Sequence, residues 1–393
     1  MPAACIYGAA GVEHTSIAAV EADRFPRPPG GVAARGSVNR SGGGTQRPER
    51  VERKMNENEK KNYLSMWNGR RGAERNPSNY QRRDDGNHIY KGNDYYEWWY
   101  VDASFDNGYH FVATFHYMNA FLRPIIPTVQ LMVYKPDGTQ VARYDLCGEK
   151  DIYACPDYCD VRMGDAWLKD TGTAYEMSMK IKGVGARLSL KPVVPGWKPG
   201  TGHLYHDEQT GAIGGWVVAV PYAEVTGELY LKDETIPVRG ACYHDHNWGN
   251  KAQFDIFEGW YWGRIHNEKY IIDYGWVIPR EKEAPVISPL LIARPGEIVL
   301  STDRMETKLE DIVRDEKTGR DYARRLVITT DTEGVKMTLT LDTIRMIETM
   351  QLPKIADWNH YYYRFLANYT MDVEVDGRRD VVTGQMLHEL MYL

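Results

Sequence analysis

The sequence predicts an all-β protein in which two antiparallel β-barrels follow an N-terminal tail. From Tyr95 onward, most of the chain consists of short apolar runs with a period of two residues, the side-chain alternation of a β-strand. Turn residues separate these runs at regular spacing, which indicates strands that form a closed meander. The length of 393 residues accommodates two barrels of about 130 to 160 residues each in addition to a tail.

The N-terminal segment has a different composition. Residues 1–54 contain stretches rich in Pro, Gly and Arg without an apolar period, which predicts a disordered tail. Met1–Val20 lacks the unbroken apolar core of a signal peptide. We interpret the tail as the result of a start codon assigned too early, with Met55 as the first residue; a poor organellar transit segment is the alternative. Residues 55–94 stay polar, and we expect them to cover the surface of the first barrel.

Residues 95–240 are expected to form the first barrel. Its strongest signal is a hairpin, because Glu97–Phe105 and Tyr109–Tyr117 flank the turn sequence Asp106-Asn107-Gly108. Thr128–Tyr134 and Thr139–Leu146 form a second expected hairpin. Further expected strands are Ala174–Ile181, Ala186–Leu190, Gly215–Val220 and Gly227–Leu231.

Residues 241–393 are expected to form the second barrel, with the boundary near Gly240. Phe257–Ile265 and Tyr270–Ile278 flank a short loop and form its first hairpin. Arg304–Arg314 is an exception with a modest helical period. The other expected strands are Val286–Ala293, Glu297–Ser301, Leu326–Thr330, Val335–Leu341, Tyr361–Asn368 and Met371–Val375.

Composition and missing motifs exclude several function classes. The net charge is −6 and clusters of Arg lie mainly in the tail, so no basic face for nucleic acid is expected. The longest apolar runs, such as Trp216–Pro221, are far shorter than the about 20 residues of a membrane-spanning helix, so we expect a cytoplasmic protein. The sequence contains no Gly-x-Ser-x-Gly elbow, phosphate loop or His-Glu-x-x-His motif. Cys155 and Cys159 lack a second ligand pair at zinc spacing and are expected to be plain thiols.

A cluster of aromatic and acidic residues lies on the first expected strand. Alternation places Glu97, Trp99 and Val101 on one face of the strand. The opposite face carries Trp98, Tyr100 and Asp102. Large side chains commonly fill the interior of a small barrel, so one interpretation is a structural plug at the barrel mouth. The alternative is that Glu97 is a buried catalytic acid.

A second cluster spans Gly240–Gly249. His244, His246 and Trp248 share one face of an extended strand, and Tyr243, Asp245 and Asn247 share the other. Each buried ring nitrogen needs a partner, because an unpaired buried polar group costs about 1–3 kcal/mol. Three interpretations remain open: a catalytic or substrate-orienting role, a hydrogen-bond network that links the two barrels, and a metal site. A metal site needs a third ligand, which His203, His206 or His266 would have to supply.

The third cluster is the hairpin that begins the second barrel. Asp273 shares a face with apolar neighbours, and burial would raise its pKa and keep it protonated near neutral pH. That is the state that a general acid requires. The alternatives are a solvent-facing position or an ion pair with Arg264 across the hairpin, which would lower the pKa. The surrounding aromatic residues are Trp260, Trp262, Tyr270 and Tyr274.

Two separated motifs carry a resemblance to a known family. Glu97–Tyr100, followed by Pro221, Thr226-Gly227, Val238-x-Gly240 and Tyr243–Gly249, resembles the lipocalin-like carotenoid 1,2-hydratase family, which includes hydroxyneurosporene synthases and, more distantly, kievitone hydratase. The resemblance extends from Tyr95 to the C-terminus, where Gly384 and Glu389 fit a weaker closing motif. It implies two calycin-type barrels and no cofactor. In the hydratases, a histidine and a tryptophan act with a carboxylic acid on the next hairpin; here these would be His246, Trp248 and Asp273. The family's tyrosine two residues before the acid is Ile271 in this chain.

The function expected from this resemblance is a cofactor-independent hydratase that adds water to a C=C bond of an isoprenoid- or carotenoid-like substrate. Asp273 would deliver the proton and His246 would orient the water, with His244 and Trp248 as further catalytic residues. The expected substrate-binding residues are Glu97, Trp99, Tyr243, Trp260, Trp262, Tyr270 and Tyr274. No metal and no nucleic acid is expected, and an apolar substrate implies transient contact with a membrane surface. The alternatives are a lipocalin-like cyclase of the Diels–Alderase type and a non-catalytic carrier of a lipid or pigment.

Overall fold

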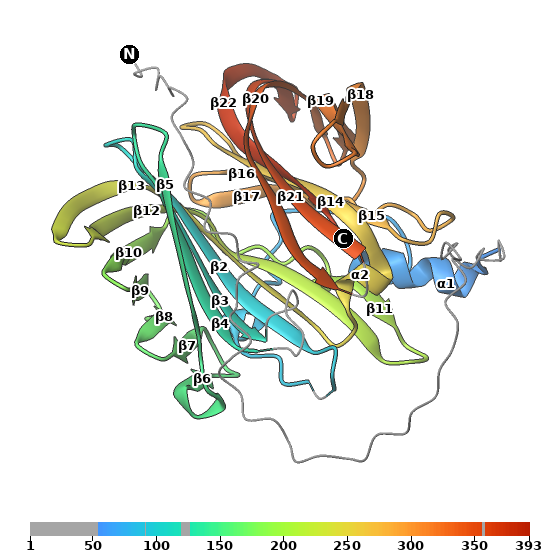
Figure 1. The fold of residues 1–393 in the computed structure, drawn as a ribbon. Coiled ribbons are helices and arrows are strands. Elements are labelled where there is room, and N and C mark those ends of the chain that lie inside the picture. The colour runs from blue at the N-terminus through green and yellow to red at the C-terminus, as the bar shows by residue number, and fades with distance from the viewer. Residues whose placement is uncertain (1–53, 91, 119–125, 356–357) are drawn as a thin grey trace, which may run out of the picture.

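A computed structural model describes residues 54–90, 92–118, 126–355 and 358–393 of the chain (Figure 1). It confirms the all-β fold class, with two large antiparallel sheets. The predicted disordered tail lies outside the described residues, except for its last position. None of the helices in the described ranges is long and apolar enough to cross a membrane.

The first sheet has 12 strands in the order β5-β4-β3-β2-β13-β12-β10-β9-β8-β7-β6, with β11 paired to β12. The strands are β2 (Tyr96–Phe105), β3 (His110–Met118), β4 (Thr128–Tyr134), β5 (Gln140–Leu146), β6 (Ile152–Ala154), β7 (Asp160–Met163), β8 (Ala166–Asp170), β9 (Tyr175–Ile181), β10 (Val184–Pro192), β11 (His203–Asp207), β12 (Ala212–Leu231) and β13 (Glu234–Gly249). The sheet curls around one apolar core to which strands from β2 to β13 contribute. The hairpin predicted at Asp106-Asn107-Gly108 joins β2 to β3, and Gly108 adopts the left-handed conformation that its turn requires.

The second sheet has 10 strands in the order β1-β17-β16-β15-β14-β22-β21-β20-β19-β18. The strands are β1 (Ala73–Arg75), β14 (Phe257–His266), β15 (Ile271–Pro279), β16 (Leu290–Arg294), β17 (Glu297–Thr302), β18 (Glu306–Asp315), β19 (Arg320–Thr332), β20 (Val335–Ile355), β21 (Trp358–Val375) and β22 (Arg378–Tyr392). The modest helical period over Arg304–Arg314 is misleading, because most of this segment is strand β18. Its backbone pairs with β19, and pairing along a neighbouring strand overrides a weak local preference.

The sheets change over after Gly249. Strand β13 pairs with β12 and β2 along its length, so the boundary expected near Gly240 falls inside this strand. The helix α2 (Gln253–Ile256) then leads into β14 of the second sheet. Residues 241–249 therefore belong to the first sheet. The chain passes to the second sheet after Gly249, where strand β13 and its pairing have ended.

The N-terminal extension enters the first barrel as well as covering it. It contains α1 (Glu57–Lys61) and the 3₁₀ helices η1 (Asn62–Trp67) and η2 (Arg82–Asp85). Asp85 and Asn87 are buried, and the backbone carbonyl of Asp85 accepts a hydrogen bond from the Trp99 indole at 3.0 Å. The extension thus supplies polar groups to the barrel interior.

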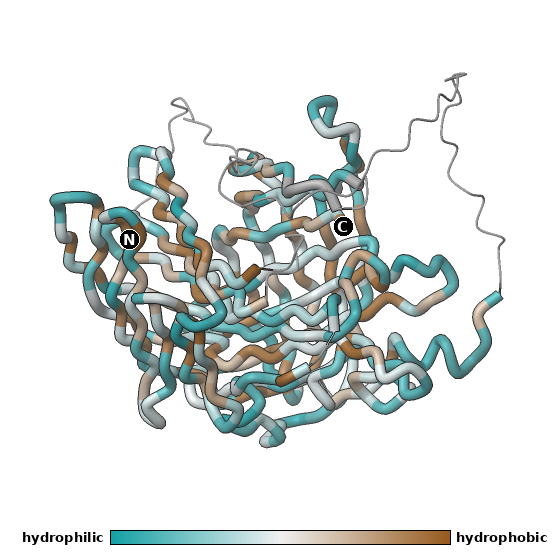
Figure 2. The backbone as a smooth tube through the Cα atoms, turned by 60° about the horizontal axis from the view of Figure 1, so that its bottom comes forward, coloured by the Kyte–Doolittle hydropathy of each residue, from teal (hydrophilic) through white to brown (hydrophobic). Residues whose placement is uncertain are grey.

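A separate apolar cluster joins the two sheets. Trp197, Trp216 and Tyr243 from the first sheet side pack with Ile271 and Leu291 of the second. Figure 2 shows hydrophilic residues concentrated in the turns and hydrophobic residues within the strands. Because Trp216 of β12 and Tyr243 of β13 pack against the second sheet, the face of these strands that points away from the core of the first sheet is also buried.

Candidate active site

Strands β2 and β13 lie side by side and divide their side chains between two compartments. Their register pairs Trp99 with His246, and these residues face the interior of the first barrel. The alternate pair, Trp98 with Asn247, faces the second sheet and lines a cavity. The two sets of faces predicted from the period of two are therefore confirmed.

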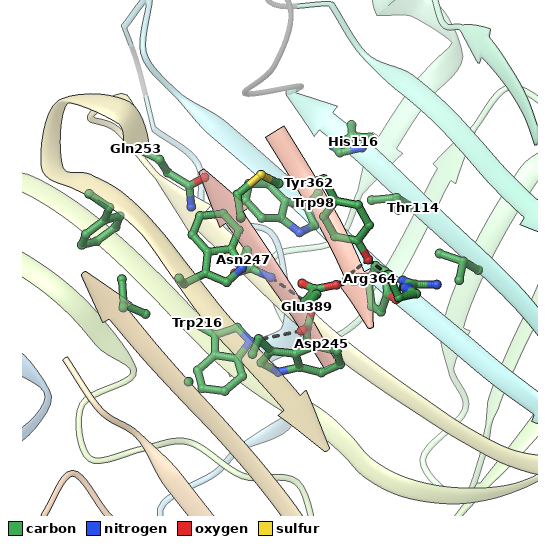
Figure 3. A pocket seen from close by; sticks show the side chains of 18 of the residues that line it. Trp98, Thr114, His116, Trp216, Asp245, Asn247, Gln253, Tyr362, Arg364 and Glu389 are labelled. Carbon is green, nitrogen blue, oxygen red and sulfur yellow. Dashed lines mark hydrogen bonds and ion pairs between the residues drawn. The ribbon is translucent and has the colours of Figure 1, made fainter. Parts of the chain in front are cut away.

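The cavity lies between the two sheets and has a volume of about 220 Å³. Its aromatic lining includes Trp98 and Trp216 from the first sheet and Trp260 and Trp262 from β14. Polar groups come from both sheets; Figure 3 shows Asp245, Asn247, Tyr362, Arg364 and Glu389 around the central space. An apolar pocket with a few convergent polar groups is typical of a small-molecule site.

Asp245 is the cavity carboxyl of the first sheet. It is buried on β13 and accepts hydrogen bonds from Asn247 Nδ2 at 3.0 Å, Trp216 Nε1 at 3.2 Å and the Tyr243 hydroxyl at 2.9 Å. Burial raises the pKa of Asp245 to about 7, although the bonds from Trp216 and Tyr243 act in the opposite direction. The side chain is thus held rigidly by donors that can stabilise its ionised form.

Glu389 on β22 is the cavity carboxyl of the second sheet. The Tyr362 hydroxyl donates a hydrogen bond to it at 2.6 Å, and the Arg364 guanidinium lies 3.9 Å away. Burial raises the pKa of Glu389, and this effect exceeds the lowering by Arg364. Glu389 also contributes to the raised pKa of Asp245, so the two carboxyls interact electrostatically. A negative charge on Glu389 therefore disfavours the ionisation of Asp245.

Asp273 has the raised pKa that the sequence predicted, but it lies outside the cavity lining. Its side chain is 1% exposed, and neither carboxyl oxygen has a hydrogen-bond partner within the described part of the chain. Burial and the nearby Asp245 raise the pKa of Asp273 well above its ordinary value, although Arg264 opposes this effect. Arg264 is paired with Asp273 in the strand register, yet its guanidinium forms an ion pair with Asp102. In the described structure the cavity is lined by Trp262 and Gly275, not by Asp273.

His244 and His246 do not meet Asp273. His244 Nε2 lies 2.9 Å from Asp85 Oδ2, and His246 Nε2 lies 2.9 Å from Glu97 Oε1, both inside the first barrel. Asp273 lies against the opposite face of β13, so the predicted grouping of His246, Trp248 and Asp273 is not formed. The physical reason is strand alternation, which turns even-numbered residues of β13 away from the second sheet.

Burial and hydrogen bonding shift the pKa values of the carboxylate and the imidazoles inside the first barrel. Burial alone would raise the pKa of Glu97, but hydrogen bonds from His246 and His88 lower it to about 2. Burial lowers the pKa of His246, although the hydrogen bond with Glu97 acts in the opposite direction. For His244, burial is outweighed by the Asp85 carboxylate, and the pKa is raised.

The remaining predicted binding residues divide between several places. Trp260 and Trp262 line the cavity, whereas Glu97 and Trp99 face the barrel lumen. Tyr243 is fully buried behind Asp245, to which it donates a hydrogen bond. Two predicted residues do not line the cavity: Tyr270 donates to Asp380, and Tyr274 packs in the core of the second sheet.

None of the three histidines that were considered as a third ligand joins the cluster of His88, Glu97 and His246. His203 and His206 pack against each other at a ring-centroid distance of 5.4 Å, and His266 Nε2 lies 2.9 Å from the Pro221 carbonyl. His88, which sequence reasoning did not include, lies 3.3 Å from Glu97 Oε1. The cavity residues Arg364 and Glu389 were also missed as site residues. They are register partners in the pairing of β21 with β22. The signal that could have identified them is a charged residue in each of two strands whose neighbouring residues are mostly apolar or aromatic.

Gly215 is required by the packing of Trp248. A Cβ at position 215 would lie 2.2 Å from the indole, whereas a Cβ at Gly214 would meet only the Tyr96 hydroxyl at 3.2 Å. We expect Gly215→Ala to lower the free energy of unfolding by about 1–3 kcal/mol, because overpacking forces the ring to move. Urea unfolding measures this effect, with Gly214→Ala as the matched control. Equal effects of the two substitutions would contradict the assignment.

No protein-family model matches the chain. A curated relative, hydroxyneurosporene dehydrogenase of Chlorobaculum tepidum, is 24% identical over 180 residues, which are 42% of this chain and 42% of the relative. A solved structure of an AttH protein from Nitrosomonas europaea has a TM-score of 0.55 at 18% identity and covers 79% of this chain and 96% of its own. The structure of CghA has a TM-score of 0.55 at 14% identity and covers 76% of this chain and 88% of its own. The curated match bears out the resemblance that the motifs predicted, and the two structures show that the fold is shared.

Proposed function

We propose that this protein adds water across a carbon–carbon double bond of an apolar, isoprenoid-like substrate bound in the cavity between the sheets. The observation that carries the proposal is the pair of cavity carboxyls, Asp245 and Glu389, set among four indole rings. Proton transfer to an unactivated alkene needs a protonated acid in a dry site. Burial raises the pKa of Glu389, which favours its protonated form, and the aromatic lining favours a dry site.

The proposed reaction uses one carboxyl as acid and the other as base. The protonated Glu389 donates its proton to an alkene carbon, which forms a C–H bond and leaves a tertiary carbocation. A water molecule forms the new C–O bond, and Asp245 accepts the proton that this water loses. The proton then returns through solvent to Glu389, so the net change is the addition of one water. Three hydrogen bonds hold Asp245 in the orientation of an acceptor.

The indoles provide the stabilisation of the cation. Trp98, Trp216, Trp260 and Trp262 come from both sheets and line the same space. A cation over an indole face gains about 0.5–1 kcal/mol at an exposed site and about 2 kcal/mol or more when water is excluded. The effect is greatest when the positive charge develops, so it favours the transition state over the neutral substrate.

The cavity volume limits how a long substrate can bind. Cavities for drug-sized ligands hold about 300–1,000 Å³. At about 220 Å³, this cavity falls below that range and fits one end of a long polyene or a short isoprenoid. We therefore expect reaction at a terminal double bond.

The experiment is incubation of the full chain with acyclic isoprenoids of graded length, dispersed in detergent, in H₂¹⁸O. Mass spectrometry should find a product heavier by one labelled water, with the label at the terminal unit. A product of unchanged mass would contradict hydration and support cyclisation, in which an internal double bond of the substrate captures the cation. Tight binding without any product would replace it by the carrier function.

A further inference from the structure

A second group of converging polar side chains lies in the lumen of the first barrel, on the other face of β13 from the cavity. His88, Glu97 and His246 each offer one ligand atom, a ring nitrogen or a carboxylate oxygen, and these three atoms lie within 4.8 Å of one another. The proposed hydration uses none of them. We infer that these three atoms form a binding site for a divalent transition-metal ion of the Zn²⁺ type.

The donor set and its spacing fit such an ion. Two imidazole nitrogens and one carboxylate oxygen are the protein ligands of many three-ligand zinc sites, which leave a fourth position for water. At metal–ligand distances of about 2.0–2.1 Å, tetrahedral ligand atoms lie ~3.3 Å apart. Glu97 Oε1 lies 3.3 Å from His88 Nδ1 and 2.9 Å from His246 Nε2, so of these two pairs the first already has the tetrahedral spacing and the second has to widen by a few tenths of an ångström. The ligand nitrogens of the two histidines lie within 4.8 Å of each other.

Two unpaired buried atoms beside the site point to a cation at His246. His246 Nδ1 and Asp85 Oδ1 lie 3.5 Å apart, and neither has a hydrogen-bond partner in the described part of the protein. If His246 donated its single proton from Nε2 to Glu97, the Nδ1 lone pair would face a carboxylate oxygen, and two buried acceptors would oppose each other. A metal ion on Nε2 places the proton on Nδ1, which then donates to Asp85. A metal-bound histidine with a carboxylate behind it is the usual outer-shell arrangement.

The other ligands are held in place by their neighbours. Tyr95 and Asn87 both donate hydrogen bonds to Glu97 Oε2, whereas Oε1 faces the two imidazoles and also accepts the backbone N–H of His88 at 2.7 Å. The His88 ring stacks on Trp248 with a centroid distance of 3.7 Å and an interplanar angle of 3°. The His246 ring stacks on Trp99 at 4.2 Å. The fixed ring planes reduce the reorganisation that metal binding would require.

The site has access to solvent on one side. The His88 side chain is 23% exposed, whereas Glu97 and His246 are fully buried. An ion can therefore enter past His88, and a water molecule can complete its coordination there. Because His88 belongs to the N-terminal extension, metal binding would also tie this segment to the barrel.

The test measures metal binding directly and does not depend on catalysis. The chelator-treated full chain is titrated with Zn²⁺ by calorimetry and with Co²⁺ by visible absorption. We expect one ion per chain and a Co²⁺ spectrum of low coordination number. His88→Ala should weaken Zn²⁺ binding by about 100-fold or more, since it removes a ligand, and Asp85→Asn should weaken it by about 10-fold, as outer-shell substitutions do. His110→Ala, which changes a histidine of β3 outside the cluster, serves as the matched control.

Thermal unfolding with and without Zn²⁺ provides the second measurement, because an ion that binds only the folded state raises the Tm. The rise should occur in the unmodified chain and in His110→Ala, and it should be absent in His88→Ala. If His88→Ala does not fold, His88→Gln keeps the side-chain volume and takes its place. No stoichiometric ion in the unmodified chain, or equal binding in the His88 variant, overturns the inference and leaves a hydrogen-bond network alone.

Discussion

Glu389→Gln is expected to lower kcat for hydration by at least about 100-fold, while substrate binding changes little. The amide keeps the size of the side chain and can still accept the hydrogen bond from Tyr362, but it has no proton of suitable acidity. The burial that raises the pKa of Glu389 keeps the unmodified carboxyl protonated to higher pH than an exposed glutamate. Steady-state kinetics on the labelled product measures the loss.

The pH profile separates this role from a structural one. Because the acid form is required, kcat of the unmodified enzyme should fall as the pH rises through the raised pKa of Glu389. The residual activity of Glu389→Gln should lack this limb. Asp273→Asn is the matched comparison, since it changes a buried carboxyl outside the cavity lining. Loss of activity in Asp273→Asn with full activity in Glu389→Gln would return the acid role to Asp273.

Asp85→Ala is expected to lower the free energy of unfolding by about 3–5 kcal/mol. The Asp85 side chain is fully buried and lies 2.9 Å from both His244 Nε2 and the Tyr175 hydroxyl. Alanine would leave these two polar groups without a partner in the barrel core, where each unsatisfied group costs about 1–3 kcal/mol. Urea unfolding followed by Trp fluorescence measures the change.

Two further substitutions define what Asp85 contributes. Asp85→Asn keeps a carbonyl oxygen that can accept from Tyr175, so its effect should be smaller than that of alanine. Asp157→Ala removes an exposed carboxylate between β6 and β7 of the first sheet and should change stability by less than about 0.5 kcal/mol. If Asp85→Ala were as mild as Asp157→Ala, the extension would not be anchored through this side chain.

The local rules that predicted the fold are those of paired strands. The period of two divided β2 and β13 correctly, because successive side chains of any strand point to opposite sides. The turn at Asn107-Gly108 was identified because few sequences other than Asn-Gly suit a two-strand reversal. These features depend only on neighbours within one hairpin, so a single sequence contains them.

The site could not be assembled in the same way. Both faces of β13 carry aromatic and titratable residues, so alternation does not indicate which face lines the cavity. Whether His246 and Asp273 meet depends on how the two sheets pack against each other. That packing depends on side chains far apart in the chain, such as Trp197 and Leu291. Glu389 comes from the last strand and reaches the site through the pairing of β22 with both β21 and β14.

Strand β13 separates the interior of the first barrel from the cavity and contributes functional side chains to both. A shift of the β13–β2 register by one residue would exchange the two faces of β13. Asp245 would then point into the first barrel and His246 into the cavity. Insertions or deletions within Tyr243–Gly249 therefore damage both compartments at once, whereas changes of length belong in the turns that flank the strand. Substitutions at alternate positions, in contrast, can alter one compartment while the other keeps its chemistry.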